Sequence, residues 1–277
     1  MFGLGCAINS SHPSIVLKKG RAGTLREPVT AFIEDLNKEP YSSLLCYPRA
    51  SETELHSRIT ELKALKVEAL EFSGKVSAFN FLVLGKGYVG IVAIAQMKGQ
   101  RVALKIRRVD ADRTSLQHEA EMLAKANSVQ VGPKLVGQSK NFLLMQLVEG
   151  DLLPAWLGTC RDKEAIRKVL EDILTQCWRL DSLRLDHGEL SKAPKHLIVD
   201  REQQPWIFDF ETASDTRKPA NVTAVCQYLF VGGGPVATAV KETFGERDRP
   251  EIIEALRLYK KARTRENFDR LQQVCFR

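Results

Sequence analysis

The pattern of apolar and polar positions changes along the chain. Between residues 76 and 107, apolar residues alternate with polar ones, valine, isoleucine and phenylalanine are frequent, and glycines interrupt the run. A period of two with these residue types predicts three antiparallel strands, at about 79–84, 90–96 and 101–107. On either side, apolar residues recur every three or four positions, which is the spacing of one helix face. The pattern therefore predicts an α+β protein in which a strand-rich unit precedes a helix-rich one.

Helical patterns flank the strands on both sides. Ser51-Glu-Thr-Glu54 is a capping box, and Leu55, Ile59 and Leu62 follow it at helical spacing, so we expect a helix at 52–66. We expect further helices at 28–37, 114–126, 163–180, from Pro250 and at 265–274, and an apolar strand at 141–147.

These changes divide the chain into four segments. We expect an irregular tail at 1–24, a helical N-terminal extension at 25–75, the strand-rich unit at 76–148 and the compact helical unit at 149–277. The stretch "RITELKAL" in the extension fits a small winged-helix module as well as an ordinary packing helix. The basic, acid-poor N-terminus fits either a disordered tail or a transit peptide.

Composition excludes several classes of protein. The longest apolar runs in the 277 residues are far shorter than the roughly 18 residues that a membrane-spanning helix needs. The six cysteines are scattered without metal-ligand spacing, which argues against a zinc site or a disulfide framework and favours a cytoplasmic protein. The net charge of +7 fits an anionic partner, such as nucleotide phosphate or RNA, and equally a solubilising surface.

The segment "LGKGYVGIVAIA" contains Gly85, Gly87 and Gly90 in the spacing GxGxxG, followed by Val92. In a dinucleotide-binding fold this motif ends a strand and opens a helix, but here the strand pattern continues through it. We therefore expect the glycines at the tip of a hairpin, where backbone N–H groups can approach phosphates because no Cβ stands in the way. By itself the motif fits an ordinary glycine-rich turn equally well.

The next strand carries "VALK", which ends at Lys105. Alternation places Ala103 and Lys105 on one face, where the small Ala103 leaves room for a flat base and Lys105 can reach phosphate oxygens. A lysine within an apolar strand needs an acidic partner. At about 100° per residue, Glu119 falls on the apolar face of the following helix and Glu121 faces solvent, so we expect a Lys105–Glu119 pair.

A glycine hairpin, a strand lysine and a helix glutamate in this order resemble the protein-kinase-like superfamily. The resemblance covers about residues 80–230 and implies a bilobal fold, with an antiparallel-sheet N-lobe, a small, mostly helical C-lobe and a helical N-terminal extension. It implies binding of ATP with Mg²⁺, with Met145 as gatekeeper. The implied nucleotide-binding residues are Leu84, Gly85, Gly87, Gly90, Val92, Ala103, Lys105, Glu119, Met145 and, through their backbone, Gln146 and Val148.

The resemblance also assigns the catalytic residues. The strand "PWIFDF" contains Asp209, and Asp209-Phe-Glu stands where kinases have Asp-Phe-Gly. Asp209 is therefore the implied Mg²⁺ ligand and Lys105 the implied phosphate-binding residue. In the loop "DHGELSKAPKH", Glu189 occupies the position of the catalytic base, and His187 is expected to be a packed structural histidine.

This loop departs from the kinase pattern at one position. The metal-binding asparagine is expected five residues after the base, but Pro194 stands there. The pair Lys195-His196 follows, so we expect either His196 to take the metal-ligand position, or Lys195 or Lys192 to neutralise phosphate charge directly. Neutral imidazole is a poorer Mg²⁺ ligand than oxygen.

Only about 65 residues follow Asp209, without an Ala-Pro-Glu motif or a long activation segment. This resembles the compact RIO-type atypical kinases, and most of all the predicted archaeal serine/threonine protein kinases, through "LGKGYVG", "VALKIRR", "HGELS" and "DFETAS". The resemblance implies transfer of the ATP γ-phosphate to an unidentified protein or to the chain itself. Three other functions stay open: an ATPase or assembly factor that meets a ribonucleoprotein through a basic surface, a small-molecule phosphotransferase, and an ATP-binding pseudokinase.

Overall fold

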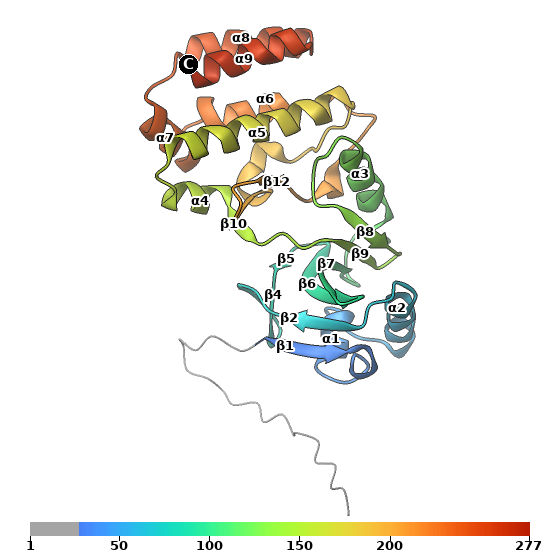
Figure 1. Ribbon diagram of the computed structural model, residues 1–277. Helices are drawn as coiled ribbons and strands as arrows, with labels where there is room; N and C mark the ends of the chain where they lie inside the picture. Colours follow the sequence, from blue (N-terminus) through green and yellow to red (C-terminus); the bar gives the residue numbers. More distant parts are fainter. Residues whose placement is uncertain (1–27) are drawn as a thin grey trace, which may run out of the picture.

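The computed structural model describes residues 28–277, except for the side chains of residues 192 and 193. Within this part of the chain, a seven-stranded antiparallel sheet forms one lobe (Figure 1). The expected tail at 1–24 lies outside the described residues. The strands run in the order β1-β2-β6-β7-β9-β8, and β5 pairs with β6 beside this path. They are β1 Val29–Phe32, β2 Ala69–Phe72, β5 Gly85–Lys86, β6 Gly90–Met97, β7 Gln100–Arg107, β8 Leu135–Gln138 and β9 Phe142–Gln146.

The central strands of this sheet have two different faces. Directly paired residues share a face, and the register pairs Lys105 with Leu143 and Ala103 with Met145. These four residues face the helical lobe. Ala103, Leu143 and Met145 are part of the apolar core of that lobe, and Lys105 is not. Alternate residues of β7 are buried in a second core on the opposite side, namely Val102, Leu104 and Ile106. The expectation that Ala103 and Lys105 share a face is confirmed.

The N-terminal segment covers the opposite face of the sheet. It contains β1, the short 3-10 helix η1 (Ile33–Asp35), α1 (Tyr41–Leu45), α2 (Glu52–Ala64) and β2. The expected helix at 28–37 is wrong, because Val29–Phe32 pairs with β2 as a strand. Its β-branched and aromatic residues suit a pleated sheet, and β2 offers an edge to pair with. Strands β1 and β2 thus join this segment to the sheet, where the sequence predicts a helical extension at 25–75.

Two other elements of this region bear on the sequence predictions. The helix expected at 52–66 is present as α2, and its cap Ser51 accepts a hydrogen bond from the Glu54 N–H at 3.3 Å. The strand expected at 79–84 is present as β4 (Phe81–Val83), and it forms a hairpin with β3 (Val76–Ala78), which the sequence did not predict. The chain reverses there through Phe79, whose φ of 51° lies in the left-handed region.

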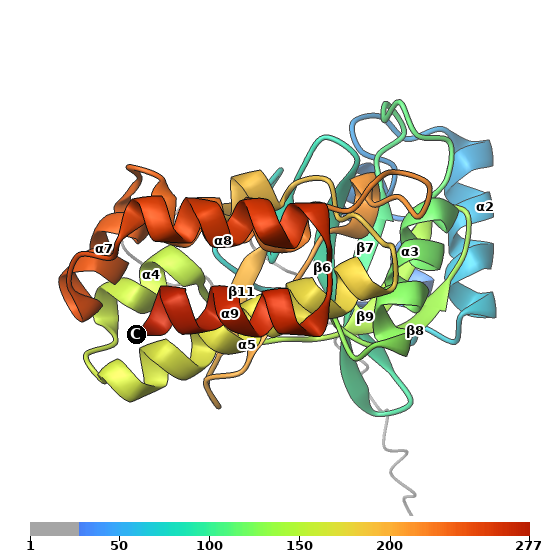
Figure 2. The same ribbon diagram turned by 90° about the horizontal axis from the view of Figure 1, so that it is seen from above.

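The second lobe is mostly helical. It contains α4 Leu153–Thr159, α5 Lys163–Ser182, α6 Asn221–Cys226, the π-helix η4 Gln227–Val231, α7 Pro235–Phe244, α8 Arg249–Lys261 and α9 Arg265–Phe276. A small sheet of β10 (Gly150–Leu152), β11 (Leu197–Asp200) and β12 (Pro205–Ile207) lies at the edge nearest the first lobe. Figure 2 shows α8 and α9 side by side across α5. The two-lobed α+β architecture expected from the sequence is confirmed.

Two connections position the site between the lobes. Residues 147–149 link β9 to β10, and α3 (Gln117–Ser128), which follows β7, packs against the short helix η3 (Phe210–Thr212) of the helical lobe. One continuous core includes α3, the facing residues of β7 and β9, and the helical lobe. Within residues 28–277, no single helix is long and apolar enough to cross a membrane, although the bent pair 221–231 and 235–244 passes that test when joined.

Candidate active site

Lys105 forms a buried ion pair with Glu119. Their residues are only 7% and 5% exposed, and the Lys105 Nζ lies 2.9 and 2.7 Å from the two carboxylate oxygens of Glu119. Glu121, one half-turn away on α3, is exposed and pairs with Gln117 instead. The pairing that the helical spacing predicts is therefore the one present, and it fixes the lysine at the boundary between the lobes.

Two further carboxylates complete the surroundings of Lys105. Its Nζ lies 3.3 Å from Asp209 Oδ1 and 3.2 Å from Glu211 Oε2. Burial lowers the pKa of Lys105, but the surrounding carboxylates outweigh burial and hold the pKa above its ordinary value. Burial likewise raises the pKa of Asp209, but Lys105 and His196 outweigh it and lower that pKa. The cluster therefore favours the charged forms of Lys105 and Asp209, whereas burial raises the pKa of Glu119.

Asp209 occupies a left-handed backbone conformation. Its φ is 70° and its ψ is 70°. The residue lies two positions after the end of strand β12 and immediately before η3. Outside glycine this conformation costs about 1–2 kcal/mol, and such strain clusters at functional sites. Glu211 stands where kinases have a glycine, and it was missed by the sequence reasoning. The only signal for it was that an acid adjoins the predicted metal ligand.

The loop between α5 and β11 brings Glu189 and His196 to the same place. His196 Nε2 lies 3.1 Å from Glu189 Oε2, and its Nδ1 lies 3.6 Å from Asp209 Oδ2. Gly188 makes this loop possible with a φ of 87°, and a Cβ there would stand 2.9 Å from Thr212 Oγ1 and also collide with Arg217. Lys195 is exposed, and the side chain of Lys192 lies outside the part of the chain that the structure describes.

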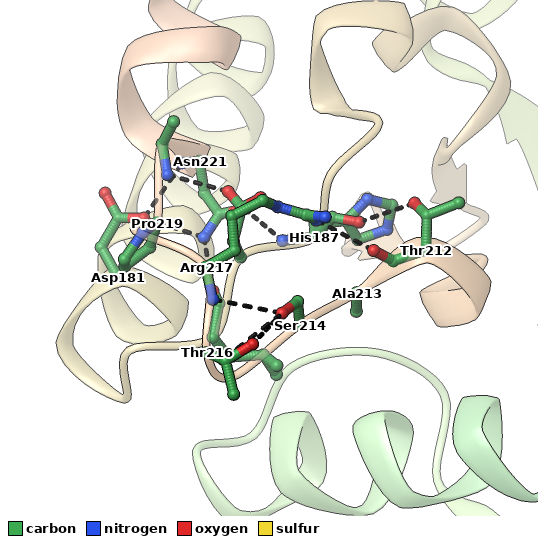
Figure 3. A network of polar contacts seen from close by, with 12 residues as sticks. Asp181, His187, Thr212, Ala213, Ser214, Thr216, Arg217, Pro219 and Asn221 are labelled. Atoms are coloured by element: carbon green, nitrogen blue, oxygen red, sulfur yellow. Dashed lines mark hydrogen bonds and ion pairs between the residues drawn. The ribbon is translucent and has the colours of Figure 1, made fainter.

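A buried polar network anchors this loop (Figure 3). Asn221, at the start of α6, accepts from the His187 N–H at 2.9 Å and donates to the Leu185 carbonyl at 2.7 Å. Asp181 in turn accepts from both the backbone and the side chain of Asn221. His187 is fully buried, donates from Nε2 to the Phe208 carbonyl at 2.9 Å, and is therefore a structural histidine, as expected.

A second set of contacts joins the same loop to the segment after Asp209. Arg217 donates to Asp186 Oδ2 at 2.6 Å and to the Thr212 carbonyl at 2.9 Å, and Thr212 Oγ1 donates to the His187 carbonyl at 3.1 Å (Figure 3). Asp186 and Ser214 also form a backbone bridge. The segments carrying Glu189 and Asp209 are thereby held together although they are distant in sequence.

Of the sheet residues expected to bind nucleotide, Val92 pairs with Lys105 and packs against the core of the helical lobe, so it lies on the same side of the sheet as the Lys105 cluster. Gly85 pairs with Val92 in a hairpin whose turn is closed by a 2.8 Å hydrogen bond from the Gly87 N–H to the Gly90 carbonyl. A Cβ on Gly90 would stand 2.9 Å from the Ile106 carbonyl and 3.1 Å from Lys105 Cγ, so the close approach to the lysine strand requires glycine. Gly85 and Gly87 have no such obstruction. Leu84 is exposed beside this hairpin.

At the connection between the lobes, Ala103 and Met145 are buried side by side, and Gln146 and Val148 are half-buried. The Gln146 N–H donates to the Lys134 carbonyl at 2.8 Å, so this N–H is engaged within the sheet lobe. A pocket beside the connection is lined by Gln146, Val148 and Trp206 among others, and it contains no member of the Lys105 cluster.

Two overlapping sets of side chains can hold a divalent cation, and Asp209 belongs to both. Glu189, His196 and Asp209 form one set, Glu119, Asp209 and Glu211 the other, and within each set the ligand atoms lie within 4.8 Å of one another. The second set offers only oxygen ligands, which suit Mg²⁺. The first set contains an imidazole nitrogen, which does not.

A two-lobed α+β fold with a buried strand lysine, its helix glutamate and an Asp-Phe-Glu aspartate beside them defines a protein of the protein-kinase-like class. The sequence profile of the RIO domain matches residues 95–225. An uncharacterized protein of Methanocaldococcus jannaschii is 30% identical over 119 residues, which is 42% of this chain and 99% of that protein. The chain belongs to the RIO family, an atypical protein-kinase-like family.

Proposed function

We propose that this protein is a cytoplasmic, ATP-dependent serine/threonine protein kinase that uses Mg²⁺·ATP and phosphorylates a protein, its own chain being one candidate. The single observation that carries the proposal is the Lys105–Glu119 ion pair at 2.7 Å with Asp209 within 3.3 Å of the same lysine. In kinases this pair orients the lysine toward the nucleotide phosphates, and the aspartate at this point binds the metal.

Each residue has a role in the proposed reaction. Lys105 binds phosphate oxygens, Glu119 holds the lysine in place, and the hairpin at Gly85 and Gly87 admits the phosphates to its backbone N–H groups. Asp209, with Glu211 beside it, is the expected Mg²⁺ ligand, and the bound ion neutralises phosphate charge. The backbone of Gln146 and Val148 binds the edge of the adenine ring. Leu84, Val92 and Ala103 pack against the two faces of the ring.

Glu189 receives the phosphoacceptor. Oε2 of its carboxylate lies 3.1 Å from His196 Nε2, and we expect Oε1 to accept a hydrogen bond from the acceptor hydroxyl. In the transfer, the bond from the acceptor oxygen to the γ-phosphorus forms, the bond to the β,γ-bridging oxygen breaks, and the acceptor proton passes to Glu189. The glutamate adequately replaces an aspartate, because this reaction depends more on positioning and charge neutralisation than on a strong base.

Incubation with γ-labelled ATP and Mg²⁺, alone and with a lysate protein fraction, tests the proposal. We expect label on protein serine or threonine, lost in Lys105→Met and Asp209→Asn. Lys125→Met is the matched control, because Lys125 forms an exposed ion pair with Asp215 away from the cluster. Free phosphate stimulated by RNA would instead indicate an assembly ATPase, label on small molecules a metabolite phosphotransferase, and nucleotide binding without turnover a pseudokinase. Each of these three outcomes overturns the proposal.

A further inference from the structure

His196 presents a buried ring nitrogen without a partner to Asp209. The residue is 4% exposed, and among the described residues no hydrogen-bond partner lies within reach of its Nδ1. The nearest charged atom is Asp209 Oδ2, at 3.6 Å, which is too far for a hydrogen bond. Buried polar atoms are nearly always paired in folded proteins. Nδ1 of the structural residue His187 is unpaired as well, but His196 Nδ1 also has a carboxylate 3.6 Å away, and the two features together point to a ligand that the chain itself does not supply.

The other ring nitrogen determines the chemical character of this one. His196 Nε2 lies 3.1 Å from Glu189 Oε2, and a carboxylate can only accept, so a proton on Nε2 faces Glu189. In the neutral ring, Nδ1 then carries a lone pair, and the lone pair faces the carboxylate of Asp209. A cation between the two atoms, either a proton on Nδ1 or a metal ion bound by both, offsets the repulsion between them.

This arrangement is the one in which histidine binds metal ions in proteins. A metal-binding histidine usually donates its second ring N–H to a carboxylate, which fixes the tautomer and the ring orientation. Two ligands bonded to one ion at about 2.1 Å lie roughly 3.0–3.4 Å apart. The 3.6 Å between His196 Nδ1 and Asp209 Oδ2 is close to that spacing, so a shift of a few tenths of an ångström brings both onto one ion.

We propose that His196 Nδ1 and Asp209 Oδ2 together bind a first-row transition-metal dication in preference to Mg²⁺, with Glu189 orienting the imidazole. Nitrogen ligands favour Mn²⁺, Fe²⁺, Co²⁺ and Zn²⁺ over the hard Mg²⁺ ion, which prefers oxygen. The ion takes the place that kinases give to the metal held by their loop asparagine. Its role in phosphoryl transfer rests on the proposed function, but the binding site itself consists of protein side chains only.

Two measurements on the full-length protein test the inference, with Mn²⁺ as probe. Pulsed electron paramagnetic resonance of bound Mn²⁺, with the metal alone and with a non-hydrolysable ATP analogue, should show coupling to an imidazole ¹⁴N nucleus. Calorimetric titration should show Mn²⁺ binding at least tenfold tighter than Mg²⁺. His196→Asn replaces the nitrogen by an amide oxygen, so the coupling should disappear and the Mn²⁺ preference should fall at least tenfold. His56→Asn, exposed on α2, is the control that should change neither.

Absence of ¹⁴N coupling in the wild-type protein, or an unchanged Mn²⁺ to Mg²⁺ ratio in His196→Asn, overturns the inference. If His196→Asn does not fold, the wild-type spectrum alone decides the question. The spectrum with the metal alone also separates the two proposals. A protein that shows the ¹⁴N coupling but binds no nucleotide supports the metal site and contradicts the proposed kinase function. Label on protein without the ¹⁴N coupling supports the kinase function and contradicts the metal site.

Discussion

The side-chain amide of Asn221 donates to the carboxylate of Asp181 at 2.8 Å, and both side chains are buried. Through Asn221, this pair holds the backbone of the loop that carries Glu189. Asn221→Ala removes one hydrogen bond from Asp181 and one from the Leu185 carbonyl, and it leaves the His187 N–H without an acceptor. We expect a loss of about 3 kcal/mol in the free energy of unfolding, measured by urea denaturation. Asn267→Ala, which removes an exposed contact to the Ala262 carbonyl, should cost well under 1 kcal/mol.

Removal of the negative charge from the lysine pair should impair nucleotide use more than folding. In Glu119→Gln the lysine keeps Asp209 and Glu211 as partners, and we expect it to move toward them and away from the phosphates. The expected loss in kcat/KM for ATP is on the order of 10²-fold, about 2.7 kcal/mol. Glu121→Gln should retain activity, because Glu121 is exposed on the same helix. Equal losses in both variants would contradict the assignment.

Arg58 should be one of the most important residues for stability. Its guanidinium is fully buried and donates to the carbonyls of Leu45 and Arg107 at 2.7 and 2.6 Å and to Glu54 at 2.8 Å. Arg58→Leu removes these bonds and leaves both carbonyls buried, so we expect a loss of about 3–5 kcal/mol. Chemical denaturation measures it, with exposed Arg257→Leu as control. A loss below 1 kcal/mol would show that the network is dispensable.

Tyr47 should control the position of the glycine hairpin. Lys86 Nζ and the Arg108 guanidinium lie 4.6 and 4.8 Å from the centre of its ring, and Arg108 also donates to the Gly87 carbonyl at 3.0 Å. Without the ring, both cations lose a cation–π contact and the hairpin loses its support from the N-terminal segment. We expect Tyr47→Ala to raise the KM for ATP several-fold and to change kcat less. A fall in kcat alone would be inconsistent with this role.

His187 should make folding sensitive to acid. Burial lowers its pKa to about 4, compared with 6.5 for an exposed histidine. As the pH falls from 6.5 towards 4, the unfolded chain binds a proton at this residue that the folded protein does not. The contribution of neutral His187 to stability is therefore fully present above pH 6.5. As the pH falls towards 4, the free energy of unfolding decreases by up to about 3 kcal/mol. Urea denaturation with EDTA at pH 7 and 4.5 should show a smaller loss in His187→Gln; parallel losses in the two proteins would refute the prediction.

The local sequence pattern was sufficient to predict the elements that carry the chemistry. The alternation through Ala103 and Lys105 placed both on one face of a strand, and the helical spacing selected Glu119 over Glu121. Such periodicities are local, because they follow from the geometry of a single strand or helix. The N-terminal strand β1 was predicted as a helix because four residues are too few to show a period. Its β-branched and aromatic residues suit a strand, and pairing with β2 decides its conformation.

The arrangement around Asp209 was beyond the reach of sequence reasoning. The sequence by itself determined the fold class, the lysine–glutamate pair and the identity of the residues in the variant loop. Only the tertiary structure showed that Glu211 contacts Lys105, that Asn221 anchors the loop, and that His196 rather than the exposed Lys195 faces Asp209. The physical reason is that contacts between distant segments depend on how the lobes pack and how each loop is anchored. Neither leaves a periodic pattern in the sequence.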